Sequence, residues 1–241
     1  MHSLTDKTMI VAGATGNVGP FVVRALLARG ATVGVPSRSP AKLEELRAEV
    51  DGPGLDRLHL FQGSLGDESD AERLGRRITA EIGAPDGVVA AMGDFVAAPS
   101  LLDAGADDLR RALEAYLLSN FIAARTFLPQ LQRSGGTYVL LQGPLAFELY
   151  PGLGADLISI ATAGQHMLFR SLAQQAAQSR ARVVELVIHA FIRDRRTQPQ
   201  SPLSGEAIGA YAAHLLAGAG PEMHGRSIEL RSPEQLDAIA A

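Results

Sequence analysis

Short β-branched runs alternate with longer helical stretches along almost all of this 241-residue chain, and this alternation constrains the fold more than any other feature. Runs such as Val183–Ile188 are largely apolar, which is typical of strands buried on both faces of a parallel sheet. Strict alternation predicts right-handed βαβ units. We therefore expect an α/β fold, with one doubly wound parallel sheet of about seven strands, helices on both faces and a single domain over residues 1–241.

The boundaries of these elements follow from the hydrophobic pattern and the flanking turn residues. Strands are expected at Thr8–Ala12, Thr32–Pro36, Leu58–Gln62, Gly87–Ala91, Thr137–Gln142, Arg182–Ile188 and Ser227–Leu230. Helices are expected at Asn17–Arg29, Pro40–Val50, Asp67–Glu81, Asp107–Gln132, Ala155–Ala177 and Gly205–Ala217.

Composition narrows the classes of function. The formal charge of −4 gives no basic face for nucleic acid, and the absence of cysteine rules out disulfides, thiolate metal sites and cysteine nucleophiles. No His, Asp and Glu group has metal-ligand spacing, so we expect no metal. The polar start MHSLTDK leads directly into a strand, and no apolar run approaches the roughly 18 residues of a membrane span. We expect a cytoplasmic protein without membrane or nucleic-acid partners.

A glycine-rich loop follows the first expected strand. Its sequence is Gly-Ala-Thr-Gly-Asn-Val-Gly over residues 13–19, and an amphipathic helix comes next. This order aims the free N–H groups of the helix at an anion, while glycine lets the backbone approach a pyrophosphate. The alternative is that the glycines only form a tight turn. We predict dinucleotide binding by Gly13, Thr15, Gly16, Asn17, Val18 and Gly19.

The end of the second strand predicts which dinucleotide binds. An acidic residue there selects NAD, whereas a basic residue accommodates the 2′-phosphate of NADP. This chain has Ser37-Arg38-Ser39 and no carboxylate at that point, so Ser37 and Arg38 favour NADP over NAD. A solvated arginine beside a helix cap is the alternative.

These motifs together resemble the short-chain dehydrogenase/reductase family over nearly the whole chain. The loop GATGNVG is similar to that of the extended and atypical branches, and the Ser37–Leu43 segment to an NADP-type second turn. Gln62–Leu65 stands where the family contacts adenine, and Ala90–Gly93 where Asn-Asn-Ala-Gly follows the fourth strand. The resemblance implies a Rossmann-type sheet and adds Ser64, Leu65, Ala91 and Gly93 to the cofactor site.

The family's catalytic tetrad is substituted at every position. The resemblance assigns its asparagine, serine, tyrosine and lysine to Tyr116, Gly143, Ile158 and Thr162. One test is independent of alignment: the only lysines are Lys7 and Lys42, so no Tyr-x-x-x-Lys occurs anywhere. A phenol with a pKa near 10 needs a nearby cation before it transfers protons efficiently at neutral pH. The standard mechanism is therefore not available to this chain.

Other polar residues are expected near the cleft. His189 follows the sixth strand and is a candidate substitute acid, with a histidine bonded to backbone as the alternative. Tyr116 is a second candidate, with helix packing as the alternative. Further polar residues that family topology brings near the cleft are Gln142, Glu148, Tyr150, Ser159 and His166, and a basic group beyond the sixth strand comprises Arg193, Arg195 and Arg196.

Two functions from different classes remain open. The first is an NADP(H)-binding oxidoreductase by family, with non-standard chemistry and without ordinary carbonyl reductase activity. The second is a catalytically silent NADP sensor, regulator or inactive partner subunit. The family's habit of pairing two long helices further predicts a homodimer or homotetramer built on the Asp107–Gln132 and Ala155–Ala177 helices.

Overall fold

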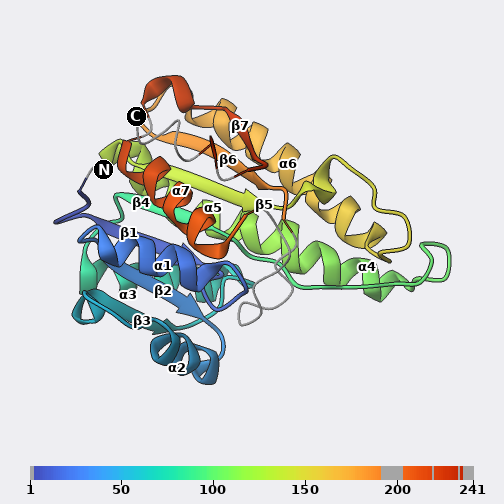
Figure 1. The fold of residues 1–241 in the computed structure, drawn as a ribbon, viewed down its shortest axis with the longest axis horizontal. Helices are drawn as coiled ribbons and strands as arrows, with labels where there is room; N and C mark the ends of the chain where they lie inside the picture. The colour runs from blue at the N-terminus through green and yellow to red at the C-terminus, as the bar shows by residue number, and fades with distance from the viewer. Residues whose placement is uncertain (1–2, 191–202, 219, 233, 236–241) are drawn as a thin grey trace.

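The computed structural model describes residues 3–190, 203–218, 220–232 and 234–235. Its seven strands form one parallel sheet in the order β3-β2-β1-β4-β5-β6-β7 (Figure 1). Their bounds are β1 Thr8–Ala12, β2 Thr32–Ser37, β3 Leu58–Gln62, β4 Gly87–Ala90, β5 Thr137–Gln142, β6 Arg182–Ile188 and β7 Ser227–Leu230. The expected doubly wound sheet is confirmed, and each strand end differs from its predicted position by at most one residue.

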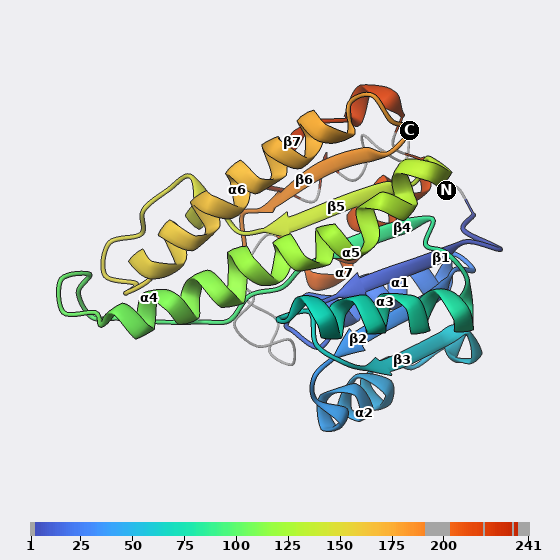
Figure 2. The ribbon, with the colours of Figure 1, turned by 180° about the vertical axis from the view of Figure 1, so that it is seen from behind.

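Helices cover both faces of the sheet. They are α1 Gly19–Ala28, α2 Pro40–Glu49, α3 Glu68–Ile82, α4 Ala106–Leu113, α5 Ser119–Ser134, α6 Asp156–Ala176 and α7 Gly205–Gly218. Short 3-10 turns lie at η1 Leu55–Arg57, η3 Pro144–Ala146 and η4 Pro221–Met223. In Figure 1, α1 and α7 lie in front of the sheet; Figure 2 shows α3, α5 and α6 covering the opposite face.

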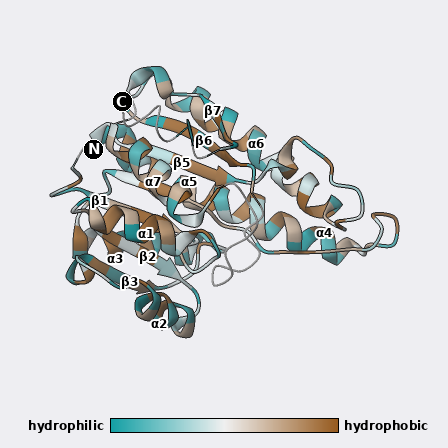
Figure 3. Cartoon of the chain, in the orientation of Figure 1, coloured by the Kyte–Doolittle hydropathy of each residue, from teal (hydrophilic) through white to brown (hydrophobic). Residues whose placement is uncertain are grey.

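The alternation of side chains along each strand divides the interior into two cores. Met9 and Val11 of β1 face the core shared with α1, α2 and α7, whereas Ile10 and Ala12 face the core under α3, α5 and α6. Because both faces are covered, strands such as β5 are buried along their whole length. Figure 3 shows much of β5 and β6 coloured as hydrophobic.

The long helix expected at Asp107–Gln132 is interrupted. It consists of α4, a π-helical turn η2 over Glu114–Leu118, and α5. A π turn widens the hydrogen-bonding ring, and such turns occur frequently at functional sites. The hydrophobic period does not reveal it, so the prediction of one uninterrupted α-helix was wrong at this point. The helix expected from Asn17 begins at Gly19, because Asn17 and Val18 belong to the preceding loop.

The α4 helix and the start of α6 extend beyond the carboxyl edge of the sheet, as an arm (Figures 1 and 2). This arm has its own small core, formed by Val96, Ala98, Ala112, Leu157 and Ala161. The loops that follow β4 and β5 meet there, where the backbone N–H of Ala98 donates to the carbonyl of Gly154 at 3.0 Å. Among the described residues, no helix is long and apolar enough to cross a membrane.

Candidate dinucleotide and active site

The glycine-rich loop lies at the carboxyl end of β1, where the strand order changes direction between β1 and β4. Gly13 has φ +86°, and a Cβ on it would lie 2.4 Å from the carbonyl oxygen of Ala91. A Cβ on Gly19 would lie 2.2 Å from the Ala14 oxygen. These glycines therefore let the loop turn tightly and press against both the loop after β4 and its own backbone.

The outer part of this loop is open. Gly16 and Asn17 are exposed, and Thr15 and Val18 are partly exposed. Val18 caps α1 without a side-chain hydrogen bond, so no side chain of the cap position occupies the first N–H groups of the helix. An open loop that leads into a helix N-terminus at the switch point fits the pyrophosphate of a dinucleotide.

The carboxyl end of β2 carries the expected polar group. Ser39 is the N-cap of α2: its hydroxyl accepts from the backbone N–H of Lys42 at 3.3 Å, and its own N–H donates to the Ser37 hydroxyl at 3.3 Å. Arg38 lies between them and is exposed. Within the described part of the chain, the Arg38 side chain makes no ion pair, which leaves its guanidinium available to a ligand.

The neighbouring strand ends complete the edge. After β3, the Ser64 hydroxyl accepts from the backbone N–H of Gly66 at 3.0 Å, and Leu65 is buried. After β4, the backbone N–H of Ala91 donates to the Ala12 carbonyl at 2.9 Å, and Gly93 is exposed. The structure thus brings the ends of β1, β2, β3 and β4 to one edge of the sheet, as the sequence predicts.

The four positions assigned to the tetrad carry little acid–base chemistry. Ile158 is buried, and the Thr162 hydroxyl donates to the Ile158 carbonyl at 2.8 Å within α6. At Gly143 a Cβ would meet no atom within 4 Å. Burial, with a smaller contribution from the Asp94 carboxylate, raises the pKa of Tyr116 to about 12. A phenol with so high a pKa is a poor proton donor near neutral pH.

Asn120 is a residue that the sequence reasoning missed. It is buried in α5, and its Nδ2 donates to the carbonyl of Tyr116 at 2.6 Å and to the carbonyl of Met92 at 3.2 Å. One amide thereby satisfies a carbonyl of the π turn and ties that turn to the loop after β4. The signal was present in the sequence, because asparagine is a poor helix former and its use inside a helix calls for a reason.

His189 follows β6 and is mostly buried. Its backbone N–H donates to the Leu230 carbonyl at 2.9 Å, and its Nε2 lies 3.2 Å from the Glu229 carboxylate. Glu229 also accepts from Arg231, whose guanidinium lies 3.7 Å from Glu148. The Tyr150 hydroxyl donates to Glu148 at 2.9 Å. Tyr150, Glu148, Arg231 and Glu229 therefore form one series of polar contacts, and His189 lies beside its Glu229 end.

Comparison with known proteins decides the family. Residues 7–193 match the family model described as short chain dehydrogenase. This chain belongs to the short-chain dehydrogenase family. The nodulation protein G of Rhizobium sp. (strain N33) is 30% identical over 212 residues, covering 87% of this chain and 83% of that protein. The dehydrogenase/reductase SDR family member 4 of Bos taurus is 25% identical over 187 residues, or 76% of this chain and 64% of that protein.

Solved structures share the fold of this short-chain dehydrogenase. A short-chain type dehydrogenase/reductase from Mycobacterium ulcerans has a TM-score of 0.83 at 21% identity, covering 97% of this chain and 91% of its own. An NADP active-site complex of RhlG from Pseudomonas aeruginosa has a TM-score of 0.80 at 22% identity, covering 95% and 98%. The family resemblance inferred from the motifs is confirmed.

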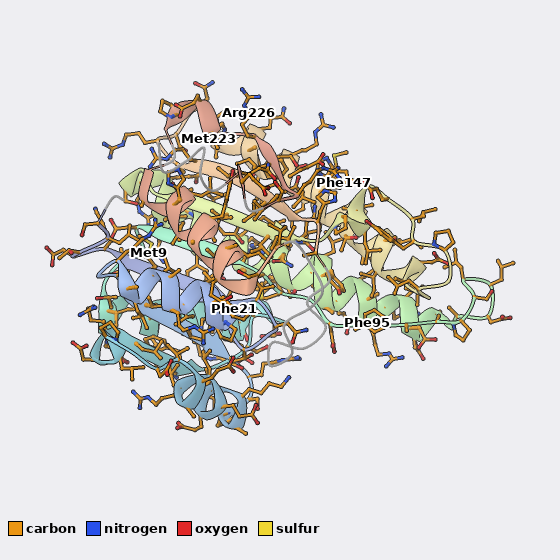
Figure 4. All side chains as sticks on the ribbon, in the orientation of Figure 1. Met9, Phe21, Phe95, Phe147, Met223 and Arg226 are labelled. Atoms are coloured by element: carbon orange, nitrogen blue, oxygen red, sulfur yellow. The ribbon has the colours of Figure 1, made fainter. Side chains whose placement is uncertain are left out.

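A second buried polar group lies in this short-chain dehydrogenase, under α6, and the sequence reasoning did not assemble it. Glu185 of β6 is fully buried and accepts from Gln142 Nε2 at 2.6 Å, from His166 Nδ1 at 2.9 Å and from the Ser227 hydroxyl. The ring of Phe147, which is labelled in Figure 4, packs edge-on against His166 at 4.7 Å between centroids. Burial raises the pKa of Glu185, although its three donors favour the charged form.

Three predictions remain to be compared with the structure. Arg193, Arg195 and Arg196 lie outside the described residues. Within the described part of the chain, no group of His, Asp and Glu side chains is arranged to hold a metal ion. Ser159 is buried in α6 near the tetrad positions.

Proposed function

We propose that this member of the short-chain dehydrogenase family binds NADP(H) in preference to NAD(H). Arg38 carries the proposal, because an exposed guanidinium stands at the end of β2 between two serines, and no carboxylate is there to meet a free ribose. Gly13, Gly16 and Gly19 would admit the pyrophosphate, and Ser64 and Leu65 would meet adenine. The NADP complex of the structurally similar RhlG supports this choice.

Calorimetry with NADP and NAD tests the proposal. A guanidinium that bonds a phosphate contributes about 1.5–3 kcal/mol, so Arg38→Ala should weaken NADP binding roughly 10- to 100-fold and leave NAD binding nearly unchanged. Arg47→Ala is the matched control, because Arg47 is an exposed arginine of the last turn of α2. Equal affinity of the wild type for the two dinucleotides would refute the preference for NADP.

We further propose that the protein lacks ordinary carbonyl reductase activity. NADPH, when bound, would supply a hydride. Ile158 offers no proton, the Thr162 hydroxyl is engaged by backbone, and Gly143 has no side chain to polarise a carbonyl. The same observation favours the second candidate function, a catalytically silent NADP sensor, regulator or inactive partner subunit.

A panel of ketones and aldehydes with NADPH separates these functions. We expect no appreciable turnover by the wild type. Turnover that falls sharply in His189→Ala would identify His189 as a substitute acid, and a fall in Tyr116→Phe would identify Tyr116. Turnover unaffected by both changes would show that another group supplies the proton.

We also propose a homodimer or homotetramer that pairs α5 and α6 with the same helices of a second copy. A groove of about 420 Å³ on this face is lined by Arg110, Leu113, Glu114, Leu117, Leu118, Phe121 and Leu168. Four large apolar side chains of these elements are exposed: Leu118 at the end of η2, Phe121 of α5, and Ile160 and Met167 of α6. Light scattering at micromolar concentration tests this proposal, and a monomer would refute it.

A further inference from the structure

A continuous series of contacts connects the glycine-rich loop with Tyr116. A Cβ on Gly13 would lie 2.4 Å from the Ala91 oxygen and 3.1 Å from the Met92 nitrogen. One residue further on, a Cβ on Gly93 would lie 2.3 Å from Cε1 and 2.9 Å from Cζ of the Tyr116 ring. The hydroxyl-bearing end of this ring therefore lies against the loop after β4, next to the switch point where a dinucleotide binds.

Asn120 fixes the position of this ring. Its Nδ2 donates one hydrogen bond to the Tyr116 carbonyl and one to the Met92 carbonyl. These two bonds fix the π turn relative to the loop after β4. The π turn also belongs to the continuous helix α4–η2–α5, whose neighbour α6 packs against it. Tyr116 is thus positioned by the Asn120 amide and by the packing of α6, which suits a side chain that has to meet a ligand in one place.

The Tyr116 hydroxyl is able to donate to such a ligand. The residue is partly exposed, and its hydroxyl makes no hydrogen bond within the described part of the chain. With its pKa raised to about 12 by burial and by Asp94, the phenol keeps its proton throughout the physiological range. Ile158, Thr162 and Gly143 offer no free polar side chain, so Tyr116 alone of the four tetrad positions brings a free donor within the described part of the chain.

We propose that the Tyr116 hydroxyl binds the second nucleoside of the dinucleotide, by donating a hydrogen bond to an oxygen of its ribose or of its carboxamide. The order of the sheet carries the assignment to this half: β2 with Arg38 lies on one side of β1, and β4 with Gly93 lies on the other. In a doubly wound sheet, the two halves of a dinucleotide lie on opposite sides of the switch point. Tyr116 is then a ligand-binding residue and no proton donor. This inference rests on the proposed dinucleotide binding.

The test compares a whole dinucleotide with its adenosine half. NADPH and adenosine 2′,5′-bisphosphate are titrated by calorimetry into the wild type, Tyr116→Phe and Tyr138→Phe. Loss of one neutral hydrogen bond should weaken NADPH binding to Tyr116→Phe about three- to tenfold and leave the bisphosphate unchanged. Tyr138→Phe is the matched control, because it removes a hydroxyl that is buried in the sheet away from the ligand; both of its affinities should equal those of the wild type.

Three results would overturn the inference. If Tyr116→Phe binds NADPH as tightly as a wild type that does bind it, Tyr116 makes no such bond, and the proposed NADP binding still stands. If Tyr116→Phe loses both ligands equally, Tyr116 only shapes the site as a whole. If the wild type binds no dinucleotide, this inference and the proposed function fail together.

A second measurement keeps the Tyr116 side chain and does not depend on the folding of Tyr116→Phe. Uniform replacement of the four tyrosines by 3-fluorotyrosine gives four fluorine resonances, assigned by single Tyr→Phe changes at the other three positions. NADPH should shift the Tyr116 resonance, and adenosine 2′,5′-bisphosphate should leave it in place. A Tyr116 resonance that ignores NADPH at saturation would refute the inference even if Tyr116→Phe does not fold.

Discussion

Replacement of Glu185 by leucine tests whether the polar group under α6 stabilises the fold. Leucine removes the acceptor for Gln142, His166 and Ser227 together. Gln142 is buried, and its Oε1 has no hydrogen-bond partner among the described residues. Glu185→Leu would therefore leave the whole Gln142 amide without a hydrogen bond. A buried donor that is left without an acceptor costs about 1–3 kcal/mol of stability. Removing one member of a buried charged group costs more than replacing the group by neutral residues.

We expect Glu185→Leu to lower the free energy of unfolding by about 3 kcal/mol. For a chain of this length, that corresponds to a fall in Tm of roughly 6–12 °C, measured by calorimetry or circular dichroism.

Glu185→Gln is the matched control. The new amide keeps the shape of Glu185, and a rotation of the Gln142 amide presents its Oε1 to the new N–H. We expect this variant to lie within about 1 kcal/mol of the wild type. A Glu185→Leu protein as stable as Glu185→Gln would refute the reasoning, because it would show that the donors find other partners without cost.

Four further experiments have definite expected outcomes: a pH profile of stability, two substitutions and a titration. The pKa of Glu185 is raised by burial above 4.5, so the folded protein holds this proton more tightly than the unfolded chain; stability should fall as pH rises from 4.5 through the raised pKa, and a Glu185→Gln protein with the same pH profile would contradict this. Gly13→Ala places a Cβ against the Ala91 oxygen at positive φ and should cost at least about 1 kcal/mol together with dinucleotide binding; an unchanged Tm would contradict it. Asn120→Ala removes two hydrogen bonds and should lower stability by about 1–3 kcal/mol, which denaturant unfolding would measure and a neutral effect would refute. Ultraviolet titration should show Tyr116 ionising near 12, and ionisation at the ordinary 10 would contradict its burial.

The sheet and the position of the glycine-rich loop at its carboxyl edge were predictable because they depend on local signals. The hydrophobic period located every strand that the structure describes. The order of strand, Gly13–Gly19 loop and helix indicated which part of the carboxyl edge of the sheet could bind a dinucleotide. The polar groups were not predictable in the same way. Glu185 meets His166, Gln142 and Ser227 only after β5, β6, β7 and α6 have packed together, and nothing in the sequence near Glu185 indicates these partners.

The π turn lies between these cases. The hydrophobic period over Asp107–Gln132 fits one uninterrupted α-helix, so it does not indicate the π turn. The only hint in the sequence is a polar side chain inside the helix. This side chain is Asn120, whose Nδ2 donates hydrogen bonds to the carbonyls of Tyr116 and Met92. Its role depends on the position of the loop after β4, which no local pattern specifies.

The arm at the carboxyl edge has a consequence for motion. Its core has five buried side chains, far fewer than either core beside the sheet, and Tyr116 is one of the partly buried residues packed against it. A unit with so little buried apolar surface opens at a smaller free energy than the rest of the molecule, so its amide hydrogens should exchange with solvent well before those of β5. A ligand held by Tyr116 would contact this weakly stabilised unit, and its binding energy would then slow exchange in residues of α4 that it never touches.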